Sequence, residues 1–247
     1  MTDTKQLDGL HVVVVGASGG IGQALIDQLA HDTHVNTIYG LSRHEYIPSL
    51  STAVHYQHLA IDYSDESSIA QAATQLPKVI DKVIVATGFL HDDQLRPEKS
   101  FKQISPENIT QNMLVNMIGP SLIAKHFLPK MRGSDYAVFA ALSARVGSIV
   151  DNQLGGWYSY RASKAALNMM IKTFSVELKR SQPKTTIIGL HPGTVNTALS
   201  EPFQRNVPEG KLFTRDYSAA RLLEVINKVG VEDSGYCYAW DGQRIAE

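Results

Sequence analysis

Residues 10–31 read LHVVVVGASGGIGQALIDQLAH. The run over residues 10–16 is continuously apolar and rich in valine, which predicts a strand buried on both faces, as in a parallel sheet. Residues 20–31 instead show helical spacing, because Ile21, Leu25 and Leu29 fall on one face. The stretch therefore predicts a strand, a glycine-rich turn and a helix in direct succession, which is the opening of an α/β unit.

The same alternation continues along the rest of the chain, and Gly119-Pro120 is expected to bend or interrupt one long helix. Seven strands that alternate with helices predict a single α/β domain with a doubly wound, seven-stranded parallel sheet and helices on both faces. Ligands in such a sheet bind at the carboxyl ends of the strands. The further strands are expected over residues 36–42, 53–62, 81–88, 135–142, 185–191 and 235–242, and the further helices over 65–76, 106–131, 158–180 and 215–229.

The composition bounds the partners and the compartment. The chain has 247 residues, of which 43% are hydrophobic, and a net charge of −1, so no global field attracts nucleic acid or an acidic membrane. The single cysteine, Cys237, cannot build a disulfide framework, which fits a reducing compartment. The polar start MTDTKQLDGLH lacks the apolar stretch of a signal peptide, and no run is long enough to span a bilayer. We expect a cytoplasmic protein without nucleic-acid or membrane partners.

Nine histidines raise the question of a metal site. The closest pairs are His31/His34 and His55/His58, and the second pair lies in an expected strand, where residues three apart point to opposite faces. The sequence contains no Cys/His cluster and no HExxH motif. We expect no metal.

The loop GASGGIG (16–22) follows a strand and opens a helix, which is the context of a dinucleotide pyrophosphate site. Glycines let the backbone approach the phosphates closely, and the helix N-terminus offers free N–H groups and a positive dipole. The spacing is G-x3-G-x-G rather than G-x-G-x-x-G, and the alternative is a glycine-rich turn that only packs a helix tightly. The residues expected to hold the pyrophosphate are Gly16, Ser18, Gly20, Ile21 and Gly22.

The stretch WYSYRASK (157–164) holds two tyrosines and a lysine. Residues i and i+4 share a helix face, so Tyr160 pairs with Lys164, whereas Tyr158 lies on nearly the opposite side. A close ammonium lowers the pKa of a tyrosine from about 10, and the hydroxyl can then exchange a proton with a substrate oxygen near neutral pH. The structural alternative is a Tyr/Lys pair on a helix surface. Tyr158 is expected to be a loop or wall residue.

Six features in one order carry a resemblance to the short-chain dehydrogenase/reductase family over nearly the whole chain. The segment LSARVGSIVDNQLGGWYSYRASKAALN and a late WDG are most similar to the C-factor-like branch, which includes carbonyl reductases. The six features, in chain order, are the glycine loop, Thr87-Gly88, Asn116, Ser143, the pair Tyr160/Lys164 and Pro192-Gly193.

The sequence also departs from the family pattern. Ala86-Thr87-Gly88 stands where members often have Asn-Ala-Gly, so an asparagine that steadies the sheet near the cofactor is missing. Val15 replaces a common threonine. The gap between Ser143 and Tyr160 is several residues longer than usual, and the extra DNQLGG segment is expected to form a loop near the mouth of the site. This gap leaves Ser148 as a rival to Ser143.

The resemblance implies roles for single residues. Ser143 hydrogen-bonds and polarises the substrate carbonyl, Lys164 also holds the nicotinamide ribose, and Asn116 links Lys164 to solvent through water. The alternatives are that Ser143 caps a turn and that Asn116 is a polar residue at a helix–helix contact. Besides the glycine loop, Tyr160 and Lys164, the residues implied to bind the cofactor are Ser42, Arg43, Asp62, Thr87, Gly88, Pro192, Gly193, Thr194 and Thr197.

The end of the second strand indicates which nicotinamide cofactor is preferred. An acid there accepts hydrogen bonds from the ribose of NAD, while an arginine suits the 2′-phosphate of NADP. The sequence YGLSRHE supplies Ser42 and Arg43 and no acid before Glu45, so we expect NADP(H) to be preferred over NAD(H). An exposed arginine without a ligand is the alternative.

These features predict an NADPH-dependent reductase of a small carbonyl compound. Residues 194–215 are expected to cover the substrate, and the helices over 106–131 and 158–180 to pair between subunits of a dimer or tetramer. The alternative function is a non-catalytic NAD(P)-binding redox sensor or signalling protein, which need not retain Tyr160 and Lys164. A sugar-nucleotide epimerase fits poorly, because Thr194 to Tyr217 leaves no room for a substrate domain.

Overall fold

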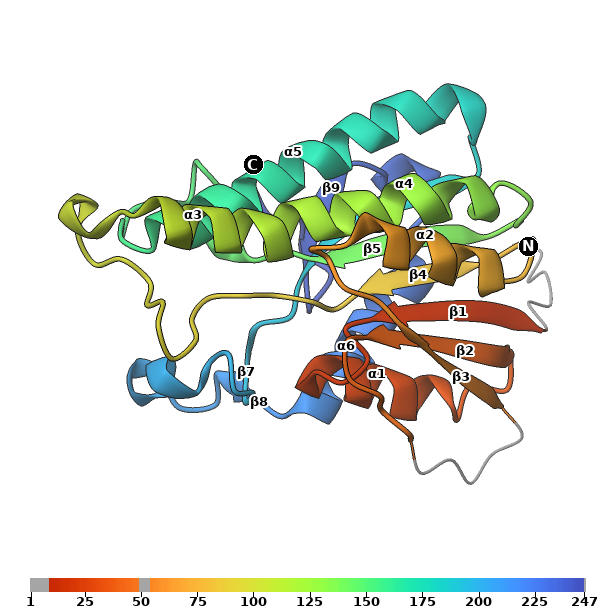
Figure 1. Cartoon of the computed structure of the whole chain (residues 1–247), viewed down its shortest axis with the longest axis horizontal. Helices are drawn as coiled ribbons and strands as arrows, with labels where there is room; N and C mark the ends of the chain where they lie inside the picture. The colour runs from red at the N-terminus through yellow and green to blue at the C-terminus, as the bar shows by residue number, and fades with distance from the viewer. Residues whose placement is uncertain (1–8, 49–53, 247) are drawn as a thin grey trace.

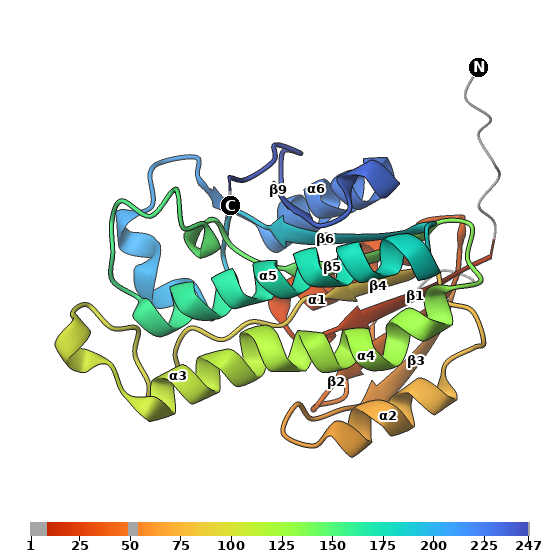
Figure 2. The ribbon, with the colours of Figure 1, turned by 90° about the horizontal axis from the view of Figure 1, so that it is seen from above.

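The computed structural model of the chain describes residues 9–48 and 54–246. Residues 1–8, most of the polar start on which the signal-peptide argument depends, lie outside the described residues, and so does residue 53 of the third expected strand. Figures 1 and 2 show one α/β domain in which a central sheet is covered by helices on both faces. The expected fold class is confirmed.

The sheet has seven strands in the order β3-β2-β1-β4-β5-β6-β9, and every neighbouring pair is parallel. Strands β4 and β5 are buried along their whole length and β1 at every residue but His11, as the apolar runs predict. The strand order reverses between β1 and β4, which makes their carboxyl ends the switch point where such sheets bind ligands. The strands are β1 Leu10–Val15, β2 Val35–Ser42, β3 His55–Ala60, β4 Lys82–Val85, β5 Ala137–Leu142, β6 Thr185–His191 and β9 Tyr236–Ala239.

Two helix layers bury the two faces of the sheet, as Figure 1 shows with α2, α4 and α5 above the strands and α1 and α6 below. Alternate residues of β1 enter the two cores: Val13 and Val15 pack against α2, α4 and α5, and Val12 and Val14 against α1 and α6. The helices are α1 Gly20–Leu29, α2 Glu66–Gln75, α3 Pro106–Met113, α4 Gly119–Met131, α5 Tyr158–Ser181 and α6 Arg215–Lys228.

The helix expected over 106–131 is interrupted, as the Gly119-Pro120 pair predicts, but by a π-helical turn, Leu114–Ile118, that ends just before Gly119. A Cβ at Gly119 would collide with the ring of Tyr63. Glycine is therefore required here by close packing. π-Helical turns are frequent at functional sites, and Asn116 lies within this one.

Residues 194–213 form a segment of their own, which Figure 1 shows at one end of the molecule beside the loop that precedes α3. It contains a second, two-stranded parallel sheet, β7 Thr194–Val195 with β8 Leu212–Phe213, and a 3₁₀ turn, Glu201–Asn206. Further 3₁₀ turns cover Phe101–Gln103, Arg145–Gly147 and Val231–Asp233. Within the described ranges, we find no helix with both the length and the apolar character needed to cross a membrane.

Candidate active site

The glycine loop leaves β1 and lies against the end of β4. Gly16 has a φ of +86°, and a Cβ there would lie 2.9 Å from Thr87 Cγ2. A Cβ at Gly22 would collide with the carbonyl oxygen of Gly16. Packing within the protein requires glycine at these two positions. The alternative interpretation, a glycine-rich turn that only packs a helix tightly, therefore explains part of the loop. Gly20 is different, because a Cβ there would meet only the movable side chain of Arg215.

The N-terminus of α1 is open to a ligand. Among the described residues, no side chain caps this helix, so its first N–H groups, those of Gly20, Ile21 and Gly22, have no intrahelical partner. The carbonyl oxygen of Ser18 accepts a hydrogen bond from Gln23 Nε2 at 3.1 Å, which braces the turn. Free donors and the positive end of the dipole suit a phosphate group. The loop therefore fits the pyrophosphate of a dinucleotide.

Arg215 lies beside this open helix end, and sequence reasoning missed it. Its Nε donates to the carbonyl oxygen of Asn196 at 3.1 Å, and its side chain lies over Gly20. A pocket of 410 Å³ is lined there by Gly20 and Arg215, by Gln23 of α1 and by Thr214, the N-cap residue of α6. No local pattern relates a residue of α6 to the loop before α1, so only the fold could reveal this cation.

The end of β2 lies next to the glycine loop, because Leu41 O accepts hydrogen bonds from the N–H groups of Gly16 and Ala17. Arg43 follows directly and is exposed, which leaves its guanidinium accessible to a ligand. Ser42 is buried, and its hydroxyl donates to His44 O at 2.7 Å. The Ser42 hydroxyl is thus used in a hydrogen bond within the turn after β2, and Arg43 is the side chain that a ligand can reach.

The other residues expected at the cofactor lie around the same edge of the sheet. Asp62, after β3, accepts hydrogen bonds from the N–H and hydroxyl of Ser64, which lower the pKa of its carboxyl. Thr87 Oγ1 lies 3.0 Å from Tyr63 Oη, so this pair braces the strand end where members often carry asparagine.

The turn after β6 is closely packed. Pro192 O accepts a hydrogen bond from Ser218 Oγ at 2.9 Å, and a Cβ at Gly193, whose φ is +79°, would meet the ring of Phe213. Thr194 lies in β7, and the Thr197 N–H donates to Ser200 Oγ. These residues stand at the start of the segment 194–213.

Helix phase separates the two tyrosines as the i, i+4 argument predicts. Tyr160 and Lys164 are buried on the inner face of α5, whereas the Tyr158 side chain is 38% exposed. Lys164 Nζ lies 5.8 Å from the centroid of the Tyr160 ring and donates to Leu142 O at 2.8 Å. That carbonyl immediately precedes Ser143, so the lysine ties α5 to the end of β5.

Burial governs the titration of both groups. It raises the pKa of the Tyr160 hydroxyl to about 12 and lowers the pKa of the Lys164 ammonium to about 7. The expected lowering of the tyrosine pKa by the lysine charge is therefore outweighed by desolvation, because a lysine with a pKa of about 7 is only partly charged near neutral pH. At neutral pH the Tyr160 hydroxyl keeps its proton and can donate it.

Ser143 and Ser148 are both buried but differ in what they contact. Ser143 Oγ donates to Asn168 Oδ1 at 2.6 Å, and Asn168 lies four residues after Lys164 on the same face of α5. Ser148 Oγ accepts from the N–H of Asp151 at 3.1 Å and so stabilises a turn. Ser143 is therefore joined to the Tyr160/Lys164 face. Asn168 could have been identified from the sequence, because it lies a further four residues beyond Lys164 and so shares the face of Tyr160 and Lys164.

Asn116 is fully buried where the π-helical turn meets α5. Its side chain forms two hydrogen bonds of 2.8 Å with the backbone of Phe89, and its Nδ2 lies 3.0 Å from Ser163 Oγ of α5. Asn116 thus makes a helix–helix contact, which is the structural role that the sequence left as the alternative to a role in the reaction. It also borders the reacting groups, because a Cβ at Gly88 would lie 3.9 Å from both Asn116 Oδ1 and Lys164 Nζ.

An aromatic cluster, formed by Trp157, Phe203 and His91, adjoins Tyr160 and was not predicted. The Trp157 ring meets that of Tyr160 edge-on at 6.2 Å and that of Phe203 at 5.1 Å, and Phe203 meets His91 at 5.5 Å. Trp157 has a φ of 53°, which makes it the one non-glycine residue with positive φ in the part of the chain that the structure describes. Backbone strain of this kind gathers at functional sites.

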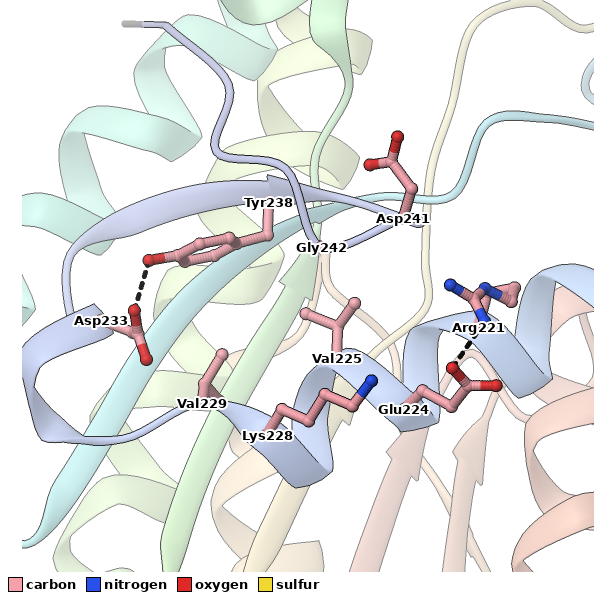
Figure 3. Close-up of a pocket in the computed structure, with 9 residues that line it drawn as sticks. All are labelled: Arg221, Glu224, Val225, Lys228, Val229, Asp233, Tyr238, Asp241 and Gly242. Atoms are coloured by element: carbon pink, nitrogen blue, oxygen red, sulfur yellow. Dashed lines mark hydrogen bonds and ion pairs between the residues drawn. The ribbon is translucent and has the colours of Figure 1, made fainter.

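Another pocket lies elsewhere, between α6 and the C-terminal strand β9, and measures 320 Å³. Figure 3 shows its charged lining compensated in part, because Arg221 pairs with Glu224 and the Tyr238 hydroxyl donates to Asp233. It does not include the Tyr160/Lys164 face. Across residues 9–48 and 54–246, no group of three or more His, Cys, Asp or Glu side chains could hold a metal ion.

Comparisons with known proteins agree with this arrangement. The family profile described as short chain dehydrogenase matches residues 10–208. A 1-hydroxy-2-glutathionyl-2-methyl-3-butene dehydrogenase of Rhodococcus sp. (strain AD45) is 29% identical over 94% of this chain and 96% of its own. C-signal of Myxococcus xanthus is 32% identical over 56% of this chain and 78% of its own. The structure of an NADPH-bound carbonyl reductase from chicken fatty liver, 23% identical, superposes with a TM-score of 0.82 over 97% of this chain and 100% of that one.

Proposed function

The chain belongs to the short-chain dehydrogenase family, and on this premise we propose that it is an NADPH-dependent reductase that converts a small carbonyl compound to an alcohol. The observation that carries the proposal is the joining of Tyr160, Lys164 and Ser143 at the carboxyl end of β5. Lys164 hydrogen-bonds Leu142 O, and Ser143 hydrogen-bonds Asn168 of the same helix. These groups lie beside Asn116 and next to a loop that fits a dinucleotide.

The cofactor would lie along the carboxyl edge of the sheet. The free N–H groups at the start of α1 would hold the pyrophosphate, and Asp62 and Thr87-Gly88 would border the nucleoside. Lys164 would hold the nicotinamide ribose, and Thr194 and Thr197 the carboxamide and phosphates. When bound, NADPH supplies a hydride for the carbonyl carbon.

The protein's own groups act on the carbonyl oxygen. Tyr160 donates a proton to it as the alcohol forms, which its protonated state at neutral pH permits. Ser143 donates a hydrogen bond to the same oxygen and stabilises the charge that develops there. Lys164 remains within the buried site, where its low pKa lets it exchange a proton near neutral pH and restore the tyrosine. Asn116 connects this lysine to solvent through water.

The preference for NADPH rests on Arg43. It is the accessible side chain at the end of β2, and a guanidinium pairs with a phosphate through charged hydrogen bonds. A carboxylate that would accept from an unmodified ribose is absent from the described residues between the end of β2 and Glu45.

Further properties belong to the same proposal. The chain is one NAD(P)-binding domain in which residues 194–215 cover the substrate, because Phe203 of this segment meets Trp157 beside Tyr160. It acts in the cytoplasm on a small molecule, as a homo-oligomer. A signalling role without turnover is the second candidate, favoured by the likeness to C-signal. A pure binding protein, however, need not retain Tyr160, Lys164 and Ser143 together.

Turnover distinguishes the two candidates. The purified chain is mixed with NADPH and a panel of aldehydes, ketones and diketones, and oxidation is followed by absorbance, with NADH in a parallel series. We expect NADPH oxidation that depends on at least one carbonyl compound. NADPH binding without oxidation by any member of a broad panel would favour the signalling role.

A further inference from the structure

A buried carboxylate outside the residues discussed so far lies beneath the start of α5. Glu98, in the loop between β4 and α3, is 2% exposed. Its Oε1 accepts hydrogen bonds from Asn108 Nδ2 at 2.8 Å and from the Ser159 hydroxyl, and its Oε2 accepts from the Ser159 N–H at 3.2 Å. Three donors therefore meet one carboxylate, one from α3 and two from the residue next to Tyr160.

From Glu98 a ladder of three amides runs along α3 and into the π-helical turn. Asn108, Asn112 and Asn116 are spaced four residues apart, so they share one face, and all are buried. Asn112 Nδ2 donates to Asn108 Oδ1 at 3.0 Å, and Asn116 Nδ2 lies 3.2 Å from Asn112 Oδ1. The ladder continues to α5, because Asn116 Nδ2 also meets Ser163 Oγ, which donates to Tyr160 O.

The direction of this ladder agrees with the carboxylate at its end and is also set by backbone groups. A carboxylate only accepts, so Asn108 must turn its amide nitrogen toward Glu98 and its oxygen toward Asn112. The backbone holds the other two amides the same way round: Asn112 Nδ2 also donates to Asn108 O at 3.0 Å. Asn116 Nδ2 donates to Phe89 O and Asn116 Oδ1 accepts from the Phe89 N–H, both at 2.8 Å. The orientation of Asn116 is therefore held by Phe89, and the element whose support depends on Glu98 is the first turn of α5.

Glu98 also holds the strained entry to α5. Its carbonyl oxygen accepts from the Trp157 N–H at 2.6 Å, at the residue whose φ is 53°. Its carboxylate takes the place of a helix cap, since it binds the Ser159 N–H in the first turn of α5, where an anion is favoured. Glu98 therefore holds both Trp157 and Ser159 by hydrogen bonds, and Tyr160 follows them directly in the chain.

We propose that Glu98 is a positioning residue for the reaction, which fixes the place of Tyr160 through the first turn of α5. The proposal rests on the proposed function, because the role of Tyr160 belongs to it. Glu98 acts on Tyr160 through Ser159 and Trp157, the two residues at the start of α5 that it hydrogen-bonds.

The test compares Glu98→Gln with Glu98→Asp and Glu107→Gln. Glutamine has the size of glutamate but brings an N–H group against the donors, whereas aspartate keeps an acceptor-only carboxylate. Glu107, in the first turn of α3, is exposed and serves as the control. We expect Glu98→Gln to lower the single-turnover rate about 10- to 100-fold at saturating NADPH and carbonyl substrate, as misplacement of a reacting group does.

The pattern of effects separates positioning from packing. The NADPH Kd of Glu98→Gln should stay close to that of the unmodified chain, Glu98→Asp should be faster than Glu98→Gln, and Glu107→Gln should be unchanged. A packing role alone predicts the reverse order, with glutamine tolerated better than the shorter aspartate. A wild-type rate in Glu98→Gln, or that reverse order, would overturn the proposal.

Two further measurements keep the proposal testable. If Glu98→Gln does not fold, Ser159→Ala removes one of the three hydrogen bonds and should lower the rate by a smaller factor, whereas an unchanged rate would overturn the proposal. If the unmodified chain turns over no carbonyl compound, the proposed function fails by itself. Acrylamide quenching of Trp157 in a Trp240→Phe background then tests Glu98: we expect stronger quenching in Glu98→Gln, and equal quenching contradicts its positioning role.

Discussion

At the scale of single residues, burial explains most of what distinguishes this site. Tyr160 and Lys164 lie on the inner face of α5, and desolvation moves their pKa values in opposite directions. Arg43 is accessible at the other end of the cofactor site, where a charge can meet a ligand without a large desolvation cost.

Arg43→Ala should weaken NADPH binding selectively. Loss of charged hydrogen bonds to the 2′-phosphate should cost about 1.5–3 kcal/mol, while the NADH Kd changes little. Titration of each cofactor by nicotinamide fluorescence measures both affinities. Arg180→Ala, at the exposed end of α5, is a matched control. Equal affinities for NADPH and NADH in the unmodified chain would contradict the assignment.

The low pKa of Lys164 should appear as a pH-dependent stability. Its pKa falls from 10.5 to about 7 on burial, so between these values the unfolded chain binds the proton that the folded chain lacks. Stability without cofactor should therefore rise with pH from about 7 to about 9.5, by at most about 1.4 kcal/mol per pH unit from this group. The raised pKa of Tyr160 acts oppositely, and only above pH about 10. The free energy of unfolding of Lys164→Met, measured with urea at several pH values, should rise less steeply with pH than that of the unmodified chain. An equal dependence on pH would refute the lowered pKa of Lys164.

At the scale of elements, periodicity predicted what is local and missed what is distant. The valine run of β1, the apolar face of α1 and the i, i+4 pair on α5 all follow from spacing along one element. Glu98, Trp157 and Arg215 could not be found this way, because their partners lie on other elements and carry no shared period. The π-helical turn was expected only as an interruption, since Gly119-Pro120 does not specify its type.

Gly22→Ala tests the contact between the glycine loop and α1. Alanine normally favours a helix over glycine, but its Cβ would collide with Gly16 O, so we expect a loss of about 1–3 kcal/mol of stability. Urea unfolding measures the change. Gly20→Ala is the control, because its Cβ meets only the movable Arg215 and should leave stability nearly unchanged or slightly higher. A Gly22→Ala variant more stable than the unmodified chain would show that the loop does not pack as described.

At the scale of the whole molecule, the sheet order places the chemistry where the strands end. The number and parallel arrangement of the seven strands could be predicted from separate runs of apolar or alternating residues, and the expected ends of most strands lie within two residues of the observed ones. The strand order could not, because it depends on contacts between distant segments. The small sheet of β7 and β8 was missed, since two-residue strands leave no pattern. The long helices leave apolar side chains exposed: Met169 and Val176 of α5, seven residues apart, and Ile118 before α4.

This exposed face predicts self-association. Met169→Glu with Val176→Glu should convert a dimer or tetramer to monomer, because charges would enter an apolar contact between helices. Sedimentation at micromolar concentrations measures the mass, and Lys228→Glu on the opposite helix layer is the control. A monomeric mass for the unmodified chain would end this part of the proposal.

The identity of the proton donor is the central claim, and one comparison tests it most directly: kcat of Tyr160→Phe and of Tyr158→Phe on the same carbonyl compound at saturating NADPH. Each change removes one hydroxyl, but only Tyr160 lies on the face of Lys164. We expect Tyr160→Phe to bind NADPH normally and lose at least about 10²-fold in kcat, and Tyr158→Phe to keep most of it. An unchanged kcat in Tyr160→Phe would contradict the account, whether Tyr158→Phe loses activity or keeps it.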